Sequence, residues 1–248
     1  RPPRAWRVPR GLLPRPEPPL DDARVAGVVV DEGLAVRWAG GAVLRGIATG
    51  GIGEEGGLPL LVPAAPAREA EAVAARVLGV DAVRAPLRDH GPAARARRWS
   101  RAMAPAGLLA AAVIAGALAV RPAPPVALAT WAVAALVPLG VAAGLAADRC
   151  RALGHARLPR HLVTSAGSWR RRREVLDLDH VLGWQVRASP WQRRRGLATV
   201  RVTTAGGTGA VTLLDLPQVD LAGLAADVTP GLLDPFLTPL AAAAPRGR

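Results

Sequence analysis

Two long, uncharged apolar stretches occupy the middle of the chain. They cover residues 102–120 and 126–147, and only five residues, three of them proline, separate them. A helix over the first stretch would rise about 28 Å, close to the roughly 30 Å hydrocarbon core of a bilayer. Because so short a connection joins antiparallel helices, the pattern predicts a transmembrane helical hairpin over residues 102–147.

The other interpretation of these stretches is a buried helix pair in a soluble protein, because both are rich in Ala and only moderately hydrophobic. A soluble helix of this length normally has a polar face, and neither stretch has one, so we favour the membrane hairpin. Gly140 and Gly144 have the small-xxx-small spacing that lets helices approach closely in lipid, so we expect them at the contact between the two helices.

Short runs of alternating apolar and polar residues follow the hairpin, with turn residues between them, and predict strands. After Pro217, apolar residues recur near a 3.6-residue period over 219–228, which predicts an amphipathic closing helix. The expected fold class is α+β with a membrane part: an antiparallel sheet or partly open barrel, capped by a C-terminal helix and joined to the two-helix hairpin. The expected strands cover residues 162–164, 174–178, 184–187, 198–203 and 210–214.

The N-terminal flank repeats part of this pattern. Residues 42–51 and 198–207 share Ala, Arg and Gly-Gly at a constant offset of 156. Each segment then continues through a strand and a proline into a helix, which we expect at 67–78 in the first flank. The shared order of elements favours two copies of one unit, the first of them partial.

Arginines crowd the outer ends of both apolar stretches, whereas the connecting turn has only Arg121. Under the positive-inside rule, both flanks of this two-span protein lie in the cytoplasm and the turn faces outward. The flanking arginines are Arg84, Arg88, Arg95, Arg97, Arg98, Arg101, Arg149, Arg151, Arg157 and Arg160.

The net charge of +13 would ordinarily suggest a nucleic-acid partner. The chain has no Lys, Asn or Tyr, however, so part of its basicity reflects GC-rich coding, in which Arg replaces Lys. No nucleic-acid motif is present, and we predict no nucleic-acid partner. The expected partner of the basic residues is the lipid bilayer with its anionic lipids, at about 1 kcal/mol per residue near the surface.

Patterns typical of catalysis, nucleotides or metals are absent. Residues 51–56 fit G-x-G-x-x-G, but Leu58-Pro59 does not open a helix, and Glu54 and Glu55 would repel a phosphate. The four histidines have no metal-ligand spacing, no serine lies in a G-x-S-x-G context, and the lone Cys150 excludes a C-x-x-C motif. We therefore predict a protein that is not an enzyme and has no cofactor and no metal site.

Two arginine clusters near tryptophans are the candidate interaction surface. They could bind anionic lipid head groups or an acidic protein partner; the alternative is a solvated edge strand protected by charge. Asp177 and Asp179 are expected to pair with neighbouring arginines. The candidate surface residues are Arg170, Arg171, Arg172, Arg173, Arg193, Arg194 and Arg195.

The C-terminal flank resembles the bacterial pleckstrin-homology-like (PH-like) domain of YdbS-type membrane proteins. The resemblance is good over 159–237 and loose over 25–80, and Leu182 departs from it, because a polar residue is usual there. It implies a seven-stranded bent sheet closed by a C-terminal helix, placed directly after a transmembrane pair, with no catalytic residues to transfer. The residues that carry it are His161–Thr164, Gly167, Arg171–Val175, His180–Val181, Val186, Gln192–Val200 and Ala205–Gly207, with Arg193–Ala198 the most specific.

The predicted organisation combines this resemblance with the hairpin. It comprises a Pro-rich, irregular or truncated segment (1–24), a partial or degenerate PH-like domain (25–80), a basic linker (81–101), the hairpin (102–120 and 126–147), a second basic linker (148–158), a PH-like domain (159–237) and a disordered tail (238–248).

The predicted function is interaction at the membrane. The PH-like domain would present a cytoplasmic surface to a protein partner, such as a related membrane protein or a second copy of the chain, or to anionic lipid head groups. The alternative is a subunit of a multi-span transporter or membrane-enzyme complex, which would place polar residues on a face of a span.

Overall fold

The structure is a computed structural model that describes residues 5–6, 20–21, 24–49, 58–119 and 124–230. Several expectations lie outside these residues: the G-x-G-x-x-G segment at 51–56, Arg121 in the hairpin turn, most of the Pro-rich segment 1–24, and the tail 238–248. Residues 5–6 and 20–21 form a small two-stranded sheet, β1(Ala5–Trp6) with β2(Leu20–Asp21).

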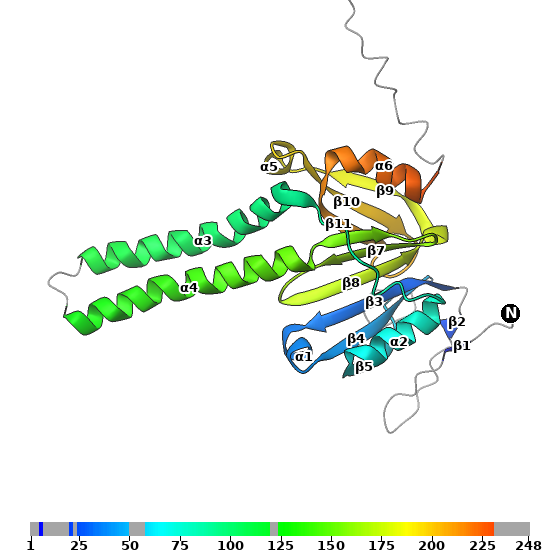
Figure 1. Ribbon diagram of the computed structural model, residues 1–248, viewed down its shortest axis with the longest axis horizontal. Helices are drawn as coiled ribbons and strands as arrows, with labels where there is room; N and C mark the ends of the chain where they lie inside the picture. Colours follow the sequence, from blue (N-terminus) through cyan, green and yellow to red (C-terminus); the bar gives the residue numbers. More distant parts are fainter. Residues whose placement is uncertain (1–4, 7–19, 22–23, 50–57, 120–123, 231–248) are drawn as a thin grey trace, which may run out of the picture.

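Two long helices project side by side from one end of the molecule (Figure 1). They are α3(Gly91–Ala119) and α4(Pro125–Ala152), and both are long and apolar enough to cross a membrane. The predicted helix pair is therefore present. In the predicted linkers 81–101 and 148–158, residues 91–101 are helical and begin α3, and residues 148–152 are helical and end α4.

The two helices meet through small side chains. Ala102, Ala106 and Ala110 lie on one face of α3 at four-residue spacing and are buried, while Gly140 and Gly144 of α4 are exposed, with nothing within 4 Å of a Cβ placed on either. The expectation that these glycines form the contact is wrong. Alanine fits at this contact because its methyl group still allows close packing. The buried alanines of α4 are Ala135, Ala142, Ala146 and Ala152.

The other strands form two sheets (Figure 1). The six-stranded sheet has the order β5-β4-β3-β8-β7-β6 and the three-stranded sheet the order β11-β10-β9, all antiparallel. The expected strands are confirmed, each extended by a few residues. The bounds are β3(Val25–Gly33), β4(Gly41–Ala48), β5(Leu60–Pro66), β6(Gly154–Arg157), β7(His161–Ala166), β8(Arg170–Asp177), β9(Val181–Arg187), β10(Leu197–Thr204) and β11(Ala210–Pro217).

The six-stranded sheet joins the two flanks of the hairpin. Its central pair is β3 from the N-terminal flank and β8 from the C-terminal flank, in register from Gly27↔Leu176 to Gly33↔Arg170. Residues 26–31 of β3 are all buried, because β3 has a neighbouring strand on each edge and apolar residues packed on both faces. The flanks are therefore continuous through main-chain hydrogen bonds.

The six strands β6–β11 follow the hairpin and are closed by α6(Gln218–Val228). The resemblance implied seven strands. Among residues 154–230 the structure has six, and the strand beside β8 is β3, from the other flank.

The same series of elements occurs once on each side of the hairpin. In the N-terminal flank it is β3, α1(Leu34–Trp38), β4, β5 and α2(Ala67–Leu78), and in the C-terminal flank β9, α5(Pro190–Arg193), β10, β11 and α6. Strand pairing agrees as well: Val25↔Ala48 and Gly27↔Ile47 in the first correspond to Val181↔Thr204 and Gly183↔Thr203 in the second, each shifted by 156 positions with the same bulge. That residues 25–80 are a partial PH-like domain stays a prediction, and these registers favour it.

Each face of the six-stranded sheet is covered. Val28 and Val175 pack on one face with α2 and residues 82–85, and Val29 and Leu176 pack on the other with the three-stranded sheet and α6. Neighbouring residues of one strand reach opposite faces because strand side chains alternate.

Candidate functional site at the base of the hairpin

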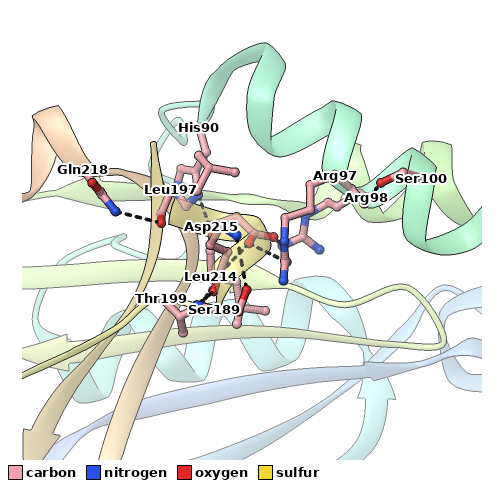
Figure 2. Close-up of polar contacts among 11 residues, drawn as sticks. His90, Arg97, Arg98, Ser100, Ser189, Leu197, Thr199, Leu214, Asp215 and Gln218 are labelled. Atoms are coloured by element: carbon pink, nitrogen blue, oxygen red, sulfur yellow. Dashed lines mark hydrogen bonds and ion pairs between the residues drawn. The ribbon is translucent and has the colours of Figure 1, made fainter. Parts of the chain in front are cut away.

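The first part of the site is a buried ion-pair cluster where α3 meets β11. Figure 2 shows Arg97 and Arg98 reaching from α3 to Asp215. An oxygen of the Asp215 carboxylate lies 2.7 Å from Nη1 of Arg97, and the other lies 3.4 Å from Nη2 of Arg98. Gln192 of α5 also donates to Asp215, at 2.9 Å. Three groups therefore share one carboxylate that is 3% exposed.

Local structure explains why Asp215 points toward α3. It is the one described non-glycine residue with a positive φ, 55°, and it lies at a register shift between β10 and β11. Such a bulge redirects a side chain away from the normal alternation. Gln192 is held by a capping box, in which the Ser189 side chain accepts from the Gln192 N–H and the Gln192 amide oxygen accepts from the Ser189 N–H.

The charges of this cluster are mostly removed from water. Burial lowers the pKa of the Arg98 guanidinium, while the Asp215 carboxylate opposes that shift. The Nε of Arg98 has no hydrogen-bond partner in the described part of the chain. A buried charge of this kind is tolerable only while its counter-ion stays in place.

A pair of buried histidines lies beside the cluster. His90 Nδ1 is 2.7 Å from the carbonyl oxygen of Leu214, so Nδ1 carries the proton and donates it. His90 Nε2 is then an acceptor, and His155 Nδ1 donates to it at 2.9 Å. Burial, followed by the neighbouring His90 and Arg88, lowers the pKa of His155 to about 4, and burial lowers the pKa of His90 as well. Both rings are neutral at physiological pH.

Asp148, near the end of α4, forms the second attachment of the hairpin. Its carboxylate accepts hydrogen bonds from Ser168 at 2.8 Å, Arg171 at 2.9 Å and Arg37 at 3.2 Å. Burial alone would raise the pKa of the Asp148 carboxyl, but the Ser168 hydroxyl, Arg171 and Arg37 together lower it. Arg37 belongs to α1, in the N-terminal flank.

The two attachments cross over the hairpin. Helix α3 follows the N-terminal flank in the sequence, yet Arg97 binds β11 of the C-terminal flank. Helix α4 precedes the C-terminal flank, yet Asp148 binds Arg37 of the N-terminal flank. Through these contacts α3 is attached to the three-stranded sheet and α4 to the six-stranded sheet.

The first predicted arginine cluster, Arg170–Arg173, binds other residues of the fold. Arg170 pairs with Asp31, Arg171 with Asp148 at 2.9 Å and Arg172 with Glu174 at 3.7 Å. Arg173 donates to the carbonyl of Ala85, and burial lowers its pKa. These residues organise the junction between the flanks, with Arg170 the most exposed of the four.

The second predicted cluster faces solvent. Arg193, Arg194 and Arg195 are all exposed, in and directly after α5, and the guanidinium of Arg194 lies 5.2 Å from the ring centre of Trp191. The expected pairing of Asp177 and Asp179 with an arginine is confirmed, because both carboxylates lie within 4.0 Å of Arg160.

Sequence analysis missed the groups that hold the hairpin to the sheets. Asp215 was hidden because its neighbours are apolar strand residues, and its partners lie 118 and 117 positions earlier in a run of arginines. A buried acidic residue on a strand otherwise composed of apolar and small residues was the available signal. No group of three or more His, Cys, Asp or Glu residues that could hold a metal occurs in the described ranges.

Residues 105–222 match the family model of the bacterial PH domain. The chain carries a bacterial PH domain. The match begins inside α3 and ends in α6, so most of the hairpin belongs to the matched unit, and Asp148, Asp215 and His155 all lie inside it. No curated protein and no solved structure matches the chain. The PH domain thus includes at least one partner of each contact that fixes the hairpin, while Arg37, His90, Arg97 and Arg98 come from outside the matched residues.

Proposed function

We propose that the chain is a non-enzymatic protein of the bacterial inner membrane. The hairpin anchors the PH domain, and both flanks face the cytoplasm, where they present an interaction surface to a protein partner and to anionic lipid head groups. The observation that carries this proposal is the exposed apolar surface of the hairpin. In the most apolar 18-residue window of each helix, only 17% of α3 and 11% of α4 is buried. Helices of a soluble core would be mostly buried, and water would oppose so large an apolar patch.

Tryptophans around the base of the hairpin support the same orientation. Trp38 ends α1 beside Arg37, Trp169 lies between Ser168 and β8, Trp191 lies in α5 beside Gln192, and Trp99 lies in α3. All four are exposed. Arg37 and Ser168 bind Asp148 of α4, and Gln192 binds Asp215, which also binds Arg97 of α3. Tryptophan favours the membrane–water interface, so these side chains would lie at the level of the lipid head groups.

The exposed arginines Arg193–Arg195 lie at the same end as Trp191 and are the group best placed to meet anionic head groups. The alternative, a subunit of a transporter or membrane-enzyme complex, has no comparable support, because residues 102–119 and 126–147 contain no ionisable side chain.

Cysteine labelling tests the topology. Cys150 is half-buried and burial raises its pKa, so it is a poor reporter and is first replaced by Ser. In this background, Pro124→Cys lies beside the hairpin turn and Val219→Cys is exposed on α6. A membrane-impermeant maleimide should label only Pro124→Cys in intact spheroplasts and both variants after permeabilisation.

Two outcomes would contradict the proposal. Labelling of Val219→Cys in intact spheroplasts would reverse the orientation. Recovery of the protein in the soluble fraction after a high-salt wash would remove the membrane anchor itself.

A further inference from the structure

Strand β9 has the same position beside β10 as β3 has beside β4, but among the described residues no strand lies along its outer edge. β3 lies between β4 and β8, whereas β9 pairs, within the ranges the structure describes, with β10 alone. The registers of β3–β4 and β9–β10 agree at an offset of 156 along their length, from Val25↔Ala48 and Val181↔Thr204 onward. The position of β8 beside β3 therefore has a defined counterpart beside β9.

The glycine that allows β8 to approach β3 has an equivalent in β9. A Cβ placed on Gly27 would collide with the main-chain carbonyl of Val175, so glycine is what allows β8 to lie against β3 at this point. The residue of β9 at the same position is Gly183, where a Cβ would meet only the hydroxyl of Thr203, at 3.4 Å. β9 therefore has the glycine that accommodates a neighbouring strand, but no described segment of the chain occupies that position.

β9 also lacks the usual protection of an edge strand. Leu182 is 64% exposed and Val186 is 49% exposed. The strand contains no proline, and its one charged residue is Arg187, at its end. Natural edge strands are normally shielded by charge, proline or a covering element. The sequence of β9 is typical of a strand that has a neighbouring strand on both edges.

We propose that the outer edge of β9 binds a β-strand of a different, membrane-anchored protein, which adds to the three-stranded sheet as β8 adds to β3. The inference rests on the proposed function, because the donor must be anchored in the same membrane. A strand antiparallel to β9 runs away from the hairpin, as β8 does (Figure 1). A donor strand that runs from the membrane into the cytoplasm therefore has the required direction.

A second copy of this chain does not fit this edge. Its β8 is already paired on both sides, with β3 and with β7. Two β9 strands related by a twofold axis would be antiparallel, and because the strands run roughly along the hairpin, the two hairpins would point in opposite directions (Figure 1). One bilayer cannot hold both.

The charge of the edge indicates what the donor strand carries. In the paired sheet, Asp31 of β3 binds Arg170 of β8. The residue of β9 that corresponds to Asp31 is Arg187, because Asp31↔Val43 matches Arg187↔Thr199 at the offset of 156. The donor strand should therefore have an acidic residue where β8 has Arg170.

Peptide binding to the full chain in lipid nanodiscs tests the inference. The probe is a fluorescent peptide of residues 168–178 in which Arg170 and Arg172 are replaced by Glu, and the unmodified peptide is the comparison. The Glu peptide should bind saturably and at least tenfold more tightly than the Arg peptide, as measured by fluorescence anisotropy. Hydrogen exchange of residues 182–187 should slow when it binds.

A matched pair of glycine variants locates the site. Gly183→Ala should weaken the Glu peptide at least tenfold, because the new methyl group would meet the added strand as a Cβ on Gly27 would meet β8. Gly223→Ala, on α6 with nothing within 4 Å of its Cβ, should bind as the unmodified chain does. Both variants should keep the thermal midpoint, which shows that they fold.

Three outcomes would overturn the inference: equal binding by Gly183→Ala and the unmodified chain, equal binding of the two peptides, or no binding of either. Crosslinking of β9 between two copies of this chain would also contradict the inference, because the bound strand would then come from a second copy. If the cysteine labelling has placed the PH domain in the cytoplasm, such a failure concerns the edge of β9 and leaves the membrane anchor intact.

Discussion

Arg97 of α3 and Asp215 of β11 are 118 positions apart in the sequence and form an ion pair of 2.7 Å at the base of the hairpin. The pair is buried and shares its carboxylate with Arg98 and Gln192. Breaking a buried pair costs far more than a surface pair, because the remaining charge stays out of water. This contact therefore sets how firmly the hairpin is held to the sheets.

Replacing Asp215 by Asn should destabilise the chain by about 3–5 kcal/mol, because Arg97 and Arg98 lose their counter-ion. Asn tolerates a positive φ, so the variant removes the charge without adding backbone strain at the bulge. Denaturant unfolding in detergent micelles measures the loss. The triple variant Arg97→Gln/Arg98→Gln/Asp215→Asn should recover part of it, and a loss below about 1 kcal/mol for Asp215→Asn alone would contradict the burial argument.

Stability should fall as the pH drops from about 6.5 to about 4. The folded pKa of His155 is about 4, below the ordinary value of 6.5, and that of His90 is also lowered, so the unfolded chain binds more protons in this range. Each histidine that gains a proton on unfolding contributes up to about 1.4 kcal/mol per pH unit. The stabilising neutral pair is complete above pH 6.5 and is lost as the pH approaches 4.

Thermal unfolding at a series of pH values measures this slope. The double variant His90→Leu/His155→Leu provides the comparison, and its midpoint should vary less between pH 6.5 and 4. A slope as steep in the double variant as in the unmodified chain would assign the acid sensitivity to other groups.

Replacing Asp148 by Ala should cost about 1–2 kcal/mol, less than Asp215→Asn, because Asp148 is only half-buried and its two arginines can reach water. The two attachments share no residue, so the costs of the two variants should add within about 0.5 kcal/mol when they are combined. Denaturant unfolding of the single and double variants checks both statements. If the two costs are strongly non-additive, the hairpin couples its attachment at Asp148 to its attachment at Asp215.

Replacing Arg193, Arg194 and Arg195 together by Gln should reduce contact with anionic lipid. Quenching of tryptophan fluorescence is measured in nanodiscs that contain either brominated phosphatidylglycerol or brominated phosphatidylcholine. The extra quenching by the anionic lipid should fall by about half or more in the triple variant, because Trp191 lies beside these arginines. The control is Arg76→Gln, exposed near the end of α2. Unchanged quenching in the triple variant would leave these arginines as solvated surface.

Periodicity predicted most individual elements but not how they combine. The helix over 67–78 and the five C-terminal strands follow from local alternation and turn residues. The pairing of β3 with β8 does not, because it joins residues about 145 positions apart, such as Val29 and Glu174, and the residue pattern of neither strand specifies its partner. The N-terminal flank was therefore expected as a separate domain, whereas it shares a sheet with the PH domain.

The site was harder to predict because arginine is so common in this chain. A run such as Arg170–Arg173 suggested a ligand surface, whereas the fold supplies Asp31, Asp148 and Glu174 as its partners. The sequence alone does not reveal which arginines form ion pairs within the fold and which are exposed. Arg193–Arg195 were included for the same reason, and their exposure became visible only once α5 was placed.

The pairing of β3 with β8 has a consequence for synthesis. At about 5–20 residues per second, a ribosome needs on the order of 10 s to make the chain between Val29 and Glu174. Throughout this time β3 has β4 on one edge and no strand on the other, and in the topology proposed above the hairpin enters the membrane in the same interval. The sheet can close only after the hairpin has been made, so a chain that stops before β8 would leave this edge of β3 exposed to chaperones and proteases.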